Sequence, residues 1–290
     1  MSTPKFTIII VNYNSSSYTG QLINSIHKFI PSFVEEIIIV DNNSRKLEKK
    51  TIQPFKNKSK VILNSENVGF SRAVNQGIRQ SKSSFLLLLN PDCELIDDSI
   101  IKLINLINKN VNIGACGGCL IDPTTNKTVP SANREATFLT GLCEFTNLKK
   151  IFPNNQFTND FWIEKSQNIV KKTNVSSLCG AFVLFRKYIN GHRVSFDNNY
   201  FMYLEDMQFG VDINKAGFKV VFDPDVKIIH HGGKSNDSKY KTILKYWYSS
   251  RKIYFKKNLS FLQGRFLEVI FTIEEYLLKK YHEILNTPNE

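Results

Sequence analysis

The chain has 290 residues, of which 42% are hydrophobic and 12% aromatic, and its formal net charge is +12. This composition is typical of a globular protein and excludes a largely disordered one. No apolar stretch approaches the ~18 residues that a helix needs to cross a bilayer, which excludes a protein with helical membrane spans. The N-terminus enters a strand-like segment directly, without the organisation of a signal peptide, and so predicts a cytoplasmic protein.

Strand-like and helix-like segments alternate over the first 120 residues. The predicted strands are 6–11, 36–40, 61–63, 85–89 and 113–120, and the predicted helices are 18–30, 69–80 and 99–109. Such alternation favours a mainly parallel sheet with right-handed crossovers, covered by helices. The sequence therefore predicts an α/β fold.

The pattern changes after residue 120. Residues 130–175 are irregular and rich in Asn, Phe and Lys, which predicts a long insert of the kind that often contacts substrate. Further along, the predicted elements are an interrupted strand at 175–186, a helix at 206–216 and strands at 219–222 and 226–230. Two helices follow from Lys239, and the second carries an apolar stripe made of Leu262, Phe266, Val269, Ile270, Ile273 and Leu277.

The positive charge is concentrated near the C-terminus. Between Asp237 and Glu268 there is no acidic residue, but there are eight basic ones, namely Lys239, Lys241, Lys245, Arg251, Lys252, Lys256, Lys257 and Arg265. Such a block predicts an anionic partner, either nucleic acid, a phospholipid surface or a phosphorylated substrate. A solvated helix face is the alternative interpretation.

The apolar run at 85–89 ends abruptly in Asn90-Pro91-Asp92. An apolar run of this length, stopped by proline, favours a strand buried on both faces over a helix. Pro91 cannot continue the hydrogen-bond ladder, so the chain turns and presents Asp92 at the carboxyl end of the strand. Open α/β sheets bind ligands at that edge, which makes Asp92 a candidate metal ligand.

Acidic residues recur at other predicted boundaries. Asp41 follows the second strand, and Glu205-Asp206 precedes a helix behind the aromatic segment 196–204. The adjacent acids have two interpretations. They stabilise the dipole of the helix, or one of them, enclosed by aromatic side chains, has a raised proton affinity and serves as a base.

His230 and His231 end the last predicted strand and enter a glycine-rich segment. Imidazole together with carboxylate suits Mn²⁺ or a similar divalent ion better than Ca²⁺, which prefers oxygen alone. Simple packing of the two rings is the alternative. The segment 67–77 contains glycines that permit close backbone approach and Arg72, which can pair with phosphate. It matches neither the Walker A loop nor the GxGxxG dinucleotide fingerprint.

Taken in order, seven segments resemble the motifs of glycosyltransferase family 2, inverting enzymes with a GT-A fold. They span residues 6–235, about four-fifths of the chain. The segments are Val11-Asn-Tyr-Asn14, Val40-Asp-Asn-Asn-Ser44, Asn67 to Gly77, Leu89-Asn-Pro-Asp92, Gly180 to Arg186, Phe201 to Asp206 and His230-His-Gly-Gly-Lys-Ser235. The sequence is most similar to the rhamnosyltransferase-like branch, which builds bacterial surface polysaccharides. This resemblance implies a GT-A domain at 1–235, with an acceptor-side insert at about 130–175, and a basic, aromatic helical extension at 236–290.

The resemblance also implies roles for individual residues. Nucleotide contacts would come from Asn12, Tyr13, Asp41, Asn67, Gly69, Arg72, Asn75 and Asn90. Asp92 matches the last acid of the family's Asp-x-Asp motif and would bind Mn²⁺ or Mg²⁺ together with His230, although Asn90 replaces the first acid. Asp206 matches the family's catalytic base, with Glu205 in support.

The implied reaction moves a sugar, with inversion, from dTDP-rhamnose or another dTDP- or UDP-sugar to a saccharide hydroxyl. Acceptors of this branch are commonly linked to a polyprenyl diphosphate. The resemblance therefore implies peripheral association with the anionic inner face of the cell membrane, to which each nearby Lys or Arg contributes ~1 kcal/mol. Nucleic acid is not an implied partner, and a homodimer stays open.

Three other functions fit parts of the sequence. A nucleotidyltransferase that makes nucleotide sugars would show a Gly- and Arg/Lys-rich signature near the first strand, which Val11-Asn-Tyr-Asn14 lacks. A nucleic-acid-binding protein would explain the sequence pI of ≈ 9.4, but no recognised motif supports it. A catalytically degenerate nucleotide-sugar-binding subunit would explain Asn90, whereas Asp206 and His230 argue against it.

Overall fold

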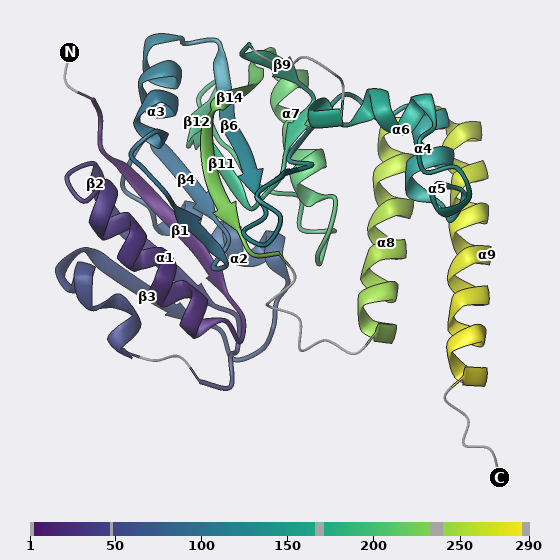
Figure 1. Ribbon diagram of the computed structural model, residues 1–290, viewed down its shortest axis with the longest axis horizontal. Coiled ribbons are helices and arrows are strands. Elements are labelled where there is room, and N and C mark those ends of the chain that lie inside the picture. The colour runs from purple at the N-terminus through teal and green to yellow at the C-terminus, as the bar shows by residue number, and fades with distance from the viewer. Residues whose placement is uncertain (1–2, 47–48, 166–170, 233–239, 286–290) are drawn as a thin grey trace.

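The computed structural model describes residues 3–46, 49–165, 171–232 and 240–285, and its centre is one large mixed β-sheet (Figure 1). The strand order is β3-β2-β1-β4-β11-β6-β14-β5, with β7 on β6 and β9 on β14. The strands of this sheet are β1 (Phe6–Asn12), β2 (Val34–Asp41), β3 (Ser59–Leu63), β4 (Phe85–Leu89), β5 (Cys93–Leu95), β6 (Ile113–Ile121), β7 (Thr128–Val129), β9 (Thr173–Val175), β11 (Phe182–Arg186) and β14 (Lys219–His230). From β3 to β14 along this order every strand runs parallel except β11. The predicted α/β fold is confirmed.

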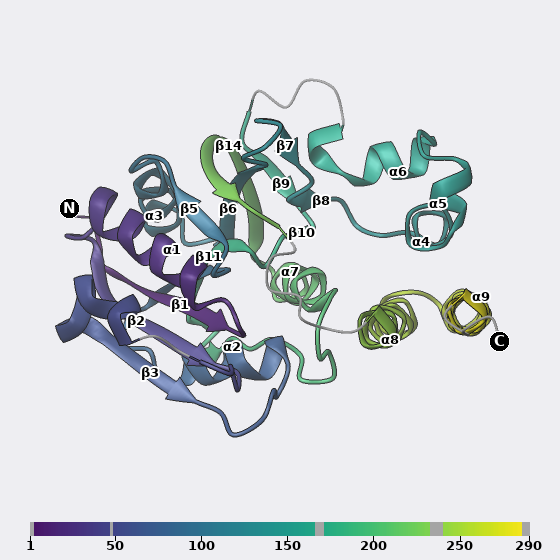
Figure 2. The same ribbon diagram turned by 60° about the horizontal axis from the view of Figure 1, so that its bottom comes forward.

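Helices cover both faces of the sheet (Figure 2). On one face lie α1 (Ser16–Phe29) and α3 (Ile100–Lys109), and on the other lie α2 (Phe70–Gln80) and α7 (Glu205–Lys215). Successive residues of a strand point to opposite faces, so Ile8 and Ile10 join the first core while Ile9 and Val11 join the second. Burial on both faces explains why the central strands are continuous apolar runs in the sequence.

Most predicted elements of the first 120 residues appear with shifts of one or two residues, and β4 matches its prediction at both ends. A difference occurs in β14, which is one strand where the sequence predicts two. Its register against β6 shifts between Asp223 and Lys227, around Pro224. The strand therefore bends at an irregularity without ending. Short elements complete this part of the chain: η1 (Lys49–Lys58), β8 (Ala132–Asn133) paired with β10 (Ser177–Leu178), and β12 (Tyr188–Ile189) paired with β13 (His192–Arg193).

The prediction of an irregular insert is wrong for its middle part. That part forms α4 (Phe138–Phe145), α5 (Leu148–Ile151), α6 (Gln156–Phe161) and η2 (Ile163–Lys165). Thr137 and Asn155 cap α4 and α6, because their side chains accept hydrogen bonds from backbone N–H groups in the first turn. Helices this short are marginal on their own, so their stability must come from packing.

The packing partner of the insert is the pair of C-terminal helices, α8 (Tyr240–Asn258) and α9 (Phe261–Leu285). Figures 1 and 2 show α8 and α9 side by side next to α4, α5 and α6. One buried cluster joins Phe145 and Phe161 of the insert to Phe255 of α8 and to Leu267 and Phe271 of α9. The insert and the C-terminal helices therefore share one core. None of the described helices combines the length and apolar character that a membrane crossing requires.

Phe255 tests this shared core. It is fully buried, and its ring centroid lies 5.2 Å from that of Phe145 and 5.7 Å from that of Phe271. Phe255→Ala should lower the free energy of unfolding by about 3–5 kcal/mol, because it leaves a cavity where three helices meet. Phe152→Ala removes an exposed ring of the insert and should change that free energy by less than ~0.5 kcal/mol. Urea denaturation measures both, and equal effects would contradict the shared core.

Candidate functional site

Polar residues from several strands meet at one edge of the sheet. β1 ends at Asn12, β2 ends at Asp41, β4 leads into Asn90, and β14 ends at His230. Because β1, β2, β4 and β14 are parallel in direction, these ends lie on the same side of the sheet, where open α/β sheets bind ligands. A cleft of ≈ 870 Å³ opens beside this edge. Of these strand-end residues Asn90 lines it, together with residues of the segment 201–207, of the insert and of α8.

Asp41 is held in a buried network next to this cleft. Asn12 Nδ2 donates to Asp41 Oδ1 at 2.7 Å, and the backbone N–H of Ser44 donates to Asp41 Oδ2 at 3.1 Å. Thr19 Oγ1 donates to Asn12 Oδ1 at 2.8 Å, which fixes the orientation of the amide. Tyr13 lies on the cleft wall beside this network. The carboxylate is thus oriented by its neighbours and keeps acceptor capacity for a ligand.

Asn42, which sequence reasoning left out, organises the neighbouring loop. Its Nδ2 donates to Asn67 Oδ1 at 2.7 Å, and its Oδ1 accepts from the backbone N–H of Val68 at 3.0 Å. Asn67 Oδ1 also accepts from the N–H of Gly69 at 3.0 Å. Asn42 and Asn67 both line the cleft. The only signal for Asn42 in the sequence is its position directly after Asp41.

Gly69 joins this loop to the opposite wall of the cleft. Its φ is +87°, and a Cβ atom there would lie 2.8 Å from the carbonyl oxygen of Phe201. That same oxygen accepts a hydrogen bond of 2.7 Å from the N–H of Phe70, at the start of α2. Glycine is required here both by the left-handed backbone and by the close approach of the segment that leads to Glu205 and Asp206.

Two of the predicted nucleotide contacts lie elsewhere. Arg72 is exposed on α2 and is not part of the cleft wall. Asn75 is buried and bonds to both backbone groups of Phe196, donating to its carbonyl oxygen and accepting from its N–H, each at 2.8 Å. Asn75 also donates to Asn198 Oδ1 at 2.9 Å. Its observed bonds hold the segment 196–198 against α2.

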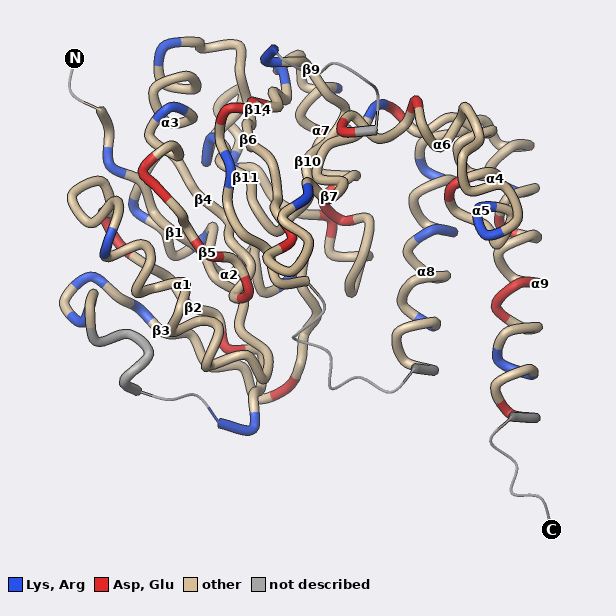
Figure 3. The backbone as a smooth tube through the Cα atoms, viewed as in Figure 1, with Lys and Arg blue, Asp and Glu red and all other residues tan. Residues whose placement is uncertain are grey.

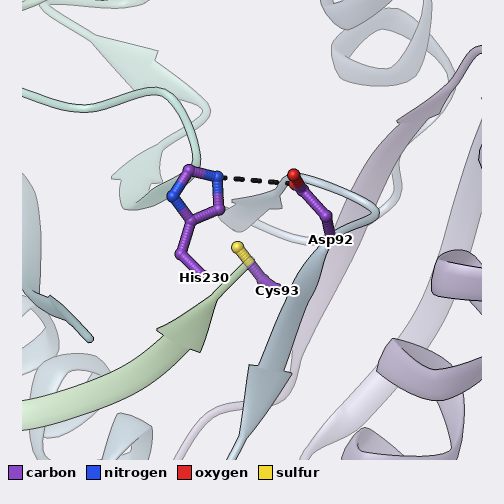
Figure 4. Close-up of side chains that lie close together, drawn as sticks. All are labelled: Asp92, Cys93 and His230. Atoms are coloured by element: carbon purple, nitrogen blue, oxygen red, sulfur yellow. Dashed lines mark ion pairs between the residues drawn. The ribbon is translucent and has the colours of Figure 1, made fainter. Parts of the chain in front are cut away.

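Asp92 and His230 face each other at the sheet edge, as Figure 4 shows. His230 Nε2 lies 3.4 Å from Asp92 Oδ1, and both side chains are largely buried. The two strands are joined there, because β5 pairs Cys93 with His230 and the N–H of His231 donates to the carbonyl oxygen of Asp92 at 2.9 Å. Asn90 and Pro91 line the cleft immediately before Asp92.

The chemistry of this pair fits a divalent cation. Among the described residues, buried His230 Nε2 has no hydrogen-bond partner, and its approach to Asp92 Oδ1 at 3.4 Å is an ion-pair contact only. Potential ligand atoms of Asp92, Cys93 and His230 lie within 4.8 Å of one another. Burial and the charge of Asp92 raise the pKa of the Cys93 thiol, which donates to the carbonyl oxygen of Ala181 at 3.3 Å. Since thiolates rather than thiols bind metals, the carboxylate and imidazole are the suitable donors.

Only part of the remaining predicted histidine motif lies within the described residues. Residues 233–235, which the sequence places in a His-x-Gly-Gly-x-Ser motif, lie outside the described residues. The ring of His231 lies 5.5 Å from that of Tyr18, and its Nε2 is 3.8 Å from Glu94 Oε2. His231 therefore points to different neighbours than His230 does.

Glu205 and Asp206 enter the cleft from the start of α7. The two residues before them, Tyr203 and Leu204, both have left-handed backbone conformations, with φ of +75° and +62°. Consecutive left-handed residues other than glycine are costly and are typical of functional sites. This turn directs both carboxylates to the cleft wall, together with Gly180 from the turn before β11.

The two carboxylates have different environments. Asp206 Oδ2 accepts from the N–H of Gly180 and Oδ1 from the N–H of Met207, each at 2.8 Å. Burial raises the pKa of Asp206, while these N–H groups act in the opposite direction by favouring the charged form. Burial and the charge of Asp206 raise the pKa of Glu205 far more strongly, and among the described residues its Oε2 has no hydrogen-bond partner. Asp206, whose two oxygens accept backbone N–H groups, is thus the better oriented of the two carboxyl groups.

Aromatic and charged side chains that sequence reasoning missed form the far wall of the cleft. Trp162 of the insert donates from Nε1 to buried Glu144 Oε1 at 2.8 Å, and Lys149 pairs with the same carboxylate. Buried Arg251 of α8 lies with its guanidinium 4.3 Å from the ring centre of Trp247. The three insert residues of this wall are at least 85 positions away from Trp247 and Arg251 of α8. No local sequence motif therefore indicates that they lie together.

Comparison with known proteins decides the family. The model of Glycosyl transferase family 2 matches residues 7–193, more than half of the chain. The chain belongs to glycosyltransferase family 2. It is therefore a sugar-transferring enzyme by family, and the resemblance read from its motifs is confirmed.

Two relatives extend the match beyond the family model. The N-acetylglucosaminyl-diphospho-decaprenol L-rhamnosyltransferase of Mycobacterium tuberculosis is 24% identical over 245 residues, covering 80% of this chain and 78% of the relative. The O-antigen biosynthesis protein RfbC of Myxococcus xanthus is 24% identical over 253 residues, covering 85% of this chain but 19% of that protein.

Solved structures support the GT-A fold. The mannosyltransferase PcManGT from Pyrobaculum calidifontis, in complex with GDP-Man and Mn²⁺, has a TM-score of 0.58 at 13% identity and covers 96% of this chain and 70% of its own. GalNAc-T7 with UDP, GalNAc and Mn²⁺ has a TM-score of 0.60 at 16% identity and covers 94% of this chain and 55% of its own. At these identities the likeness shows the fold, which agrees with the predicted GT-A assignment.

A substitution at Gly69 tests the contact between Gly69 and Phe201 beside the cleft. Gly69→Ala should destabilise the protein and weaken nucleotide binding, because the new methyl group strains the backbone and displaces Phe201. Gly191→Ala is the matched control, since Gly191 has φ +77° but no atom within 4 Å of the added Cβ. Urea denaturation and nucleotide titration measure both variants. Equal losses of stability with unchanged nucleotide binding would contradict a role for the Gly69–Phe201 contact at the site.

Proposed function

We propose that this enzyme transfers a sugar, with inversion, from a nucleoside-diphosphate donor to a hydroxyl group of a saccharide acceptor, with Asp206 as the base. The supporting observation is the position of Asp206. Its carboxylate is fixed by the N–H of Gly180 and lies on the wall of a cleft between the polar sheet edge and the aromatic insert side. A base between a donor half and an acceptor half is the geometry that direct displacement requires.

The residues of the chain would divide the work as follows. The nucleobase and ribose of the donor are bound and oriented by Asn12, Tyr13 and Asp41. Its diphosphate lies along Asn67, Gly69 and Asn90. Asp206 takes the proton of the acceptor hydroxyl as that oxygen attacks the anomeric carbon, and the nucleoside diphosphate leaves. Glu205, the neighbouring residue on the cleft wall, supports Asp206. Nucleotide contacts by Arg72 and Asn75 stay predictions; Arg72 is exposed on α2, and Asn75 is bonded to Phe196 and Asn198.

Asp92 and His230 would hold Mn²⁺ or Mg²⁺, which supplies positive charge for the departing diphosphate. Two observations support this assignment: His230 Nε2 faces Asp92 Oδ1 at 3.4 Å, and among the described residues it makes no hydrogen bond. Both solved structures named above are complexes with Mn²⁺, which agrees with it.

For the donor we propose dTDP-rhamnose, with other dTDP- or UDP-sugars as alternatives, and for the acceptor a saccharide on a polyprenyl diphosphate, in the synthesis of a surface polysaccharide. The name of the mycobacterial relative, which includes both rhamnose and a diphospho-decaprenol acceptor, supports both assignments. The aromatic wall with Trp162 and Trp247 suits the acceptor saccharide, and Lys149 and Lys150 on the same wall suit its diphosphate.

A lipid-linked acceptor would bring the enzyme to the inner face of the cell membrane as a peripheral protein. The basic block contributes less to this association than its sequence predicts. Lys252, Lys256 and Lys257 pair with acids, at 2.8, 3.0 and 2.9 Å, and Arg251 is buried. Lys239 lies outside the described residues. The acceptor itself is therefore the main membrane contact in this proposal.

Asp206→Asn tests the base. The variant should lower kcat by about 10²- to 10⁴-fold while donor binding survives, because the amide keeps the shape of the side chain but accepts no proton. Asp212→Asn, on the same helix, is the control and should keep wild-type activity. Release of nucleoside diphosphate in the presence of acceptor measures turnover. Turnover of the Asp206 variant at the wild-type rate would remove Asp206 from this role.

The same assignment predicts the pH dependence. A base must be ionised, so kcat/KM should fall as the pH drops through the pKa of Asp206. Burial raises that pKa, which places the acidic limb of the wild-type profile at a higher pH than an ordinary aspartate gives.

Asp92→Ala tests the cation site through binding rather than activity. Wild-type protein should gain thermal stability from dTDP or UDP with Mn²⁺, by about 2.7 kcal/mol when the ligand is at 100 times its Kd. Asp92→Ala should lose the Mn²⁺-dependent part of this gain because it lacks the carboxylate ligand. Asp122→Ala, in an exposed turn, should behave as wild type. A gain in stability that does not depend on Mn²⁺ in the wild type would contradict the metal assignment. It would not affect the assignment of Asp206 as the base.

A further inference from the structure

Helix α9 has apolar residues on two opposite sides, and only one side is covered. Leu267 and Phe271 are buried against α8 and the insert. The opposite side carries side chains that are 52–78% exposed, which we call the outer stripe, namely Leu262, Phe266, Val269, Ile273, Tyr276 and Leu277. Figures 1 and 2 show α9 at the outer edge of the molecule, with α8 between it and the sheet. At one margin of the outer stripe the ring of Phe266 lies 5.7 Å from that of Phe138 of α4, and the side chains of the stripe from Val269 to Leu277 are still more than half exposed.

The outer stripe has the spacing of a helix–helix contact. Positions 262, 266, 269, 273 and 276 follow steps of four, three, four and three, which is the heptad pattern by which two helices pack together. Its exposed surface is on the order of 600 Å², given ~150–250 Å² per large side chain and the exposed fractions. This is at the upper limit for a patch on a monomer and close to the ~800 Å² that each partner buries in a stable interface.

The charges of α9 argue against a lipid surface as the occupant. The helix has three basic residues (Arg265, Lys279 and Lys280) and four acidic ones (Glu268, Glu274, Glu275 and Glu283), a formal sum of −1. Figure 3 shows both signs along α9. Helices that lie on membranes instead have polar faces rich in Lys and Arg. The partner of the outer stripe is therefore better sought in a protein surface of mixed charge.

A second copy of the same helix offers opposite charges in one orientation, in addition to the pairs within the helix, Arg265 with Glu268 at 2.9 Å and Glu283 with Lys280 at 3.5 Å. Arg265 and Glu283 are 18 residues apart, five helical turns at 3.6 residues per turn, so they lie on the same side of α9 near its two ends. In an antiparallel pair, Arg265 of one copy lies near Glu283 of the other, whereas a parallel pair brings like charges together. Two-fold symmetry repeats each contact, as expected for an isologous dimer.

We propose that the outer stripe of α9 is a self-interface. Two copies of the chain pair through antiparallel α9 helices, with the two-fold axis near Ile273. The inference does not depend on the proposed reaction, because α9 presents this side away from the cleft-lining side of α8.

The mass of the full chain in solution tests the proposal. Light scattering coupled to size exclusion at micromolar concentration should give twice 33.4 kDa. Val269→Glu combined with Ile273→Glu should give the monomer mass, with the dissociation constant raised at least about 100-fold, because charges replace the central contacts. Val111→Glu combined with Leu63→Glu is the matched control at exposed apolar positions elsewhere and should remain dimeric. Unchanged far-UV circular dichroism shows that the variants are folded.

A charge exchange tests the orientation. Arg265→Glu should weaken the dimer, and adding Glu283→Arg should restore it if the helices are antiparallel. Failure of this rescue would overturn the antiparallel arrangement. A monomeric wild type, or a dimer that persists in the Val269/Ile273 variant, would overturn the self-interface. So would a wild-type monomer that floats with anionic liposomes and loses that binding in the same variant, which would assign the outer stripe to lipid.

Discussion

The turn before β11 is the constraint on which the candidate site depends. Strand β11 lies between β4 and β6. Hydrogen bonds connect the turn before it to the loop of Asp92 and to the start of α7. The carbonyl oxygen of Ala181 accepts from the N–H of Asn90 at 3.0 Å, and the N–H of Gly180 donates to Asp206 at 2.8 Å. The loop that carries Asp92 and the helix that carries Asp206 are therefore fixed to one rigid element. β11 can serve this way because it runs antiparallel in an otherwise parallel part of the sheet, which brings its start to the edge where β4 ends.

The sequence predicts the sheet and its covering helices well because those signals are local. Strands buried on both faces are continuous apolar runs, and their helices have apolar residues at helical spacing. The insert is different. Its helices are short, and Phe145 and Phe161 become ordered by contact with Phe255 and Phe271, which are about 100 residues further along the chain. Nothing within the insert indicates those partners, so an irregular segment is the natural prediction and the wrong one.

The same distinction separates predicted from missed site residues. Asn12, Asp41, Asn90, Asp92 and His230 were predictable because each follows or ends a strand, and the carboxyl ends of parallel strands meet. The far wall of the cleft was not predictable, because Trp162 and Arg251 come together only when the insert packs on α8. Within α2 the two residues of one motif differ in environment, because the helix turns Arg72 to solvent and Asn75 into the core.

Asn90 replaces the first acid of the family's motif, and its contacts explain how the fold tolerates this. Its N–H donates to Ala181 and its carbonyl oxygen accepts from the N–H of Cys93 at 3.1 Å, so the backbone of residue 90, not its side chain, shapes the loop. What Asn90 lacks, compared with the acid it replaces, is a negative charge. With one carboxylate at the proposed cation site, Asp92 and His230 together balance only half of a divalent charge. The diphosphate of the donor would supply the remaining negative charge, so cation and nucleotide would each raise the affinity for the other.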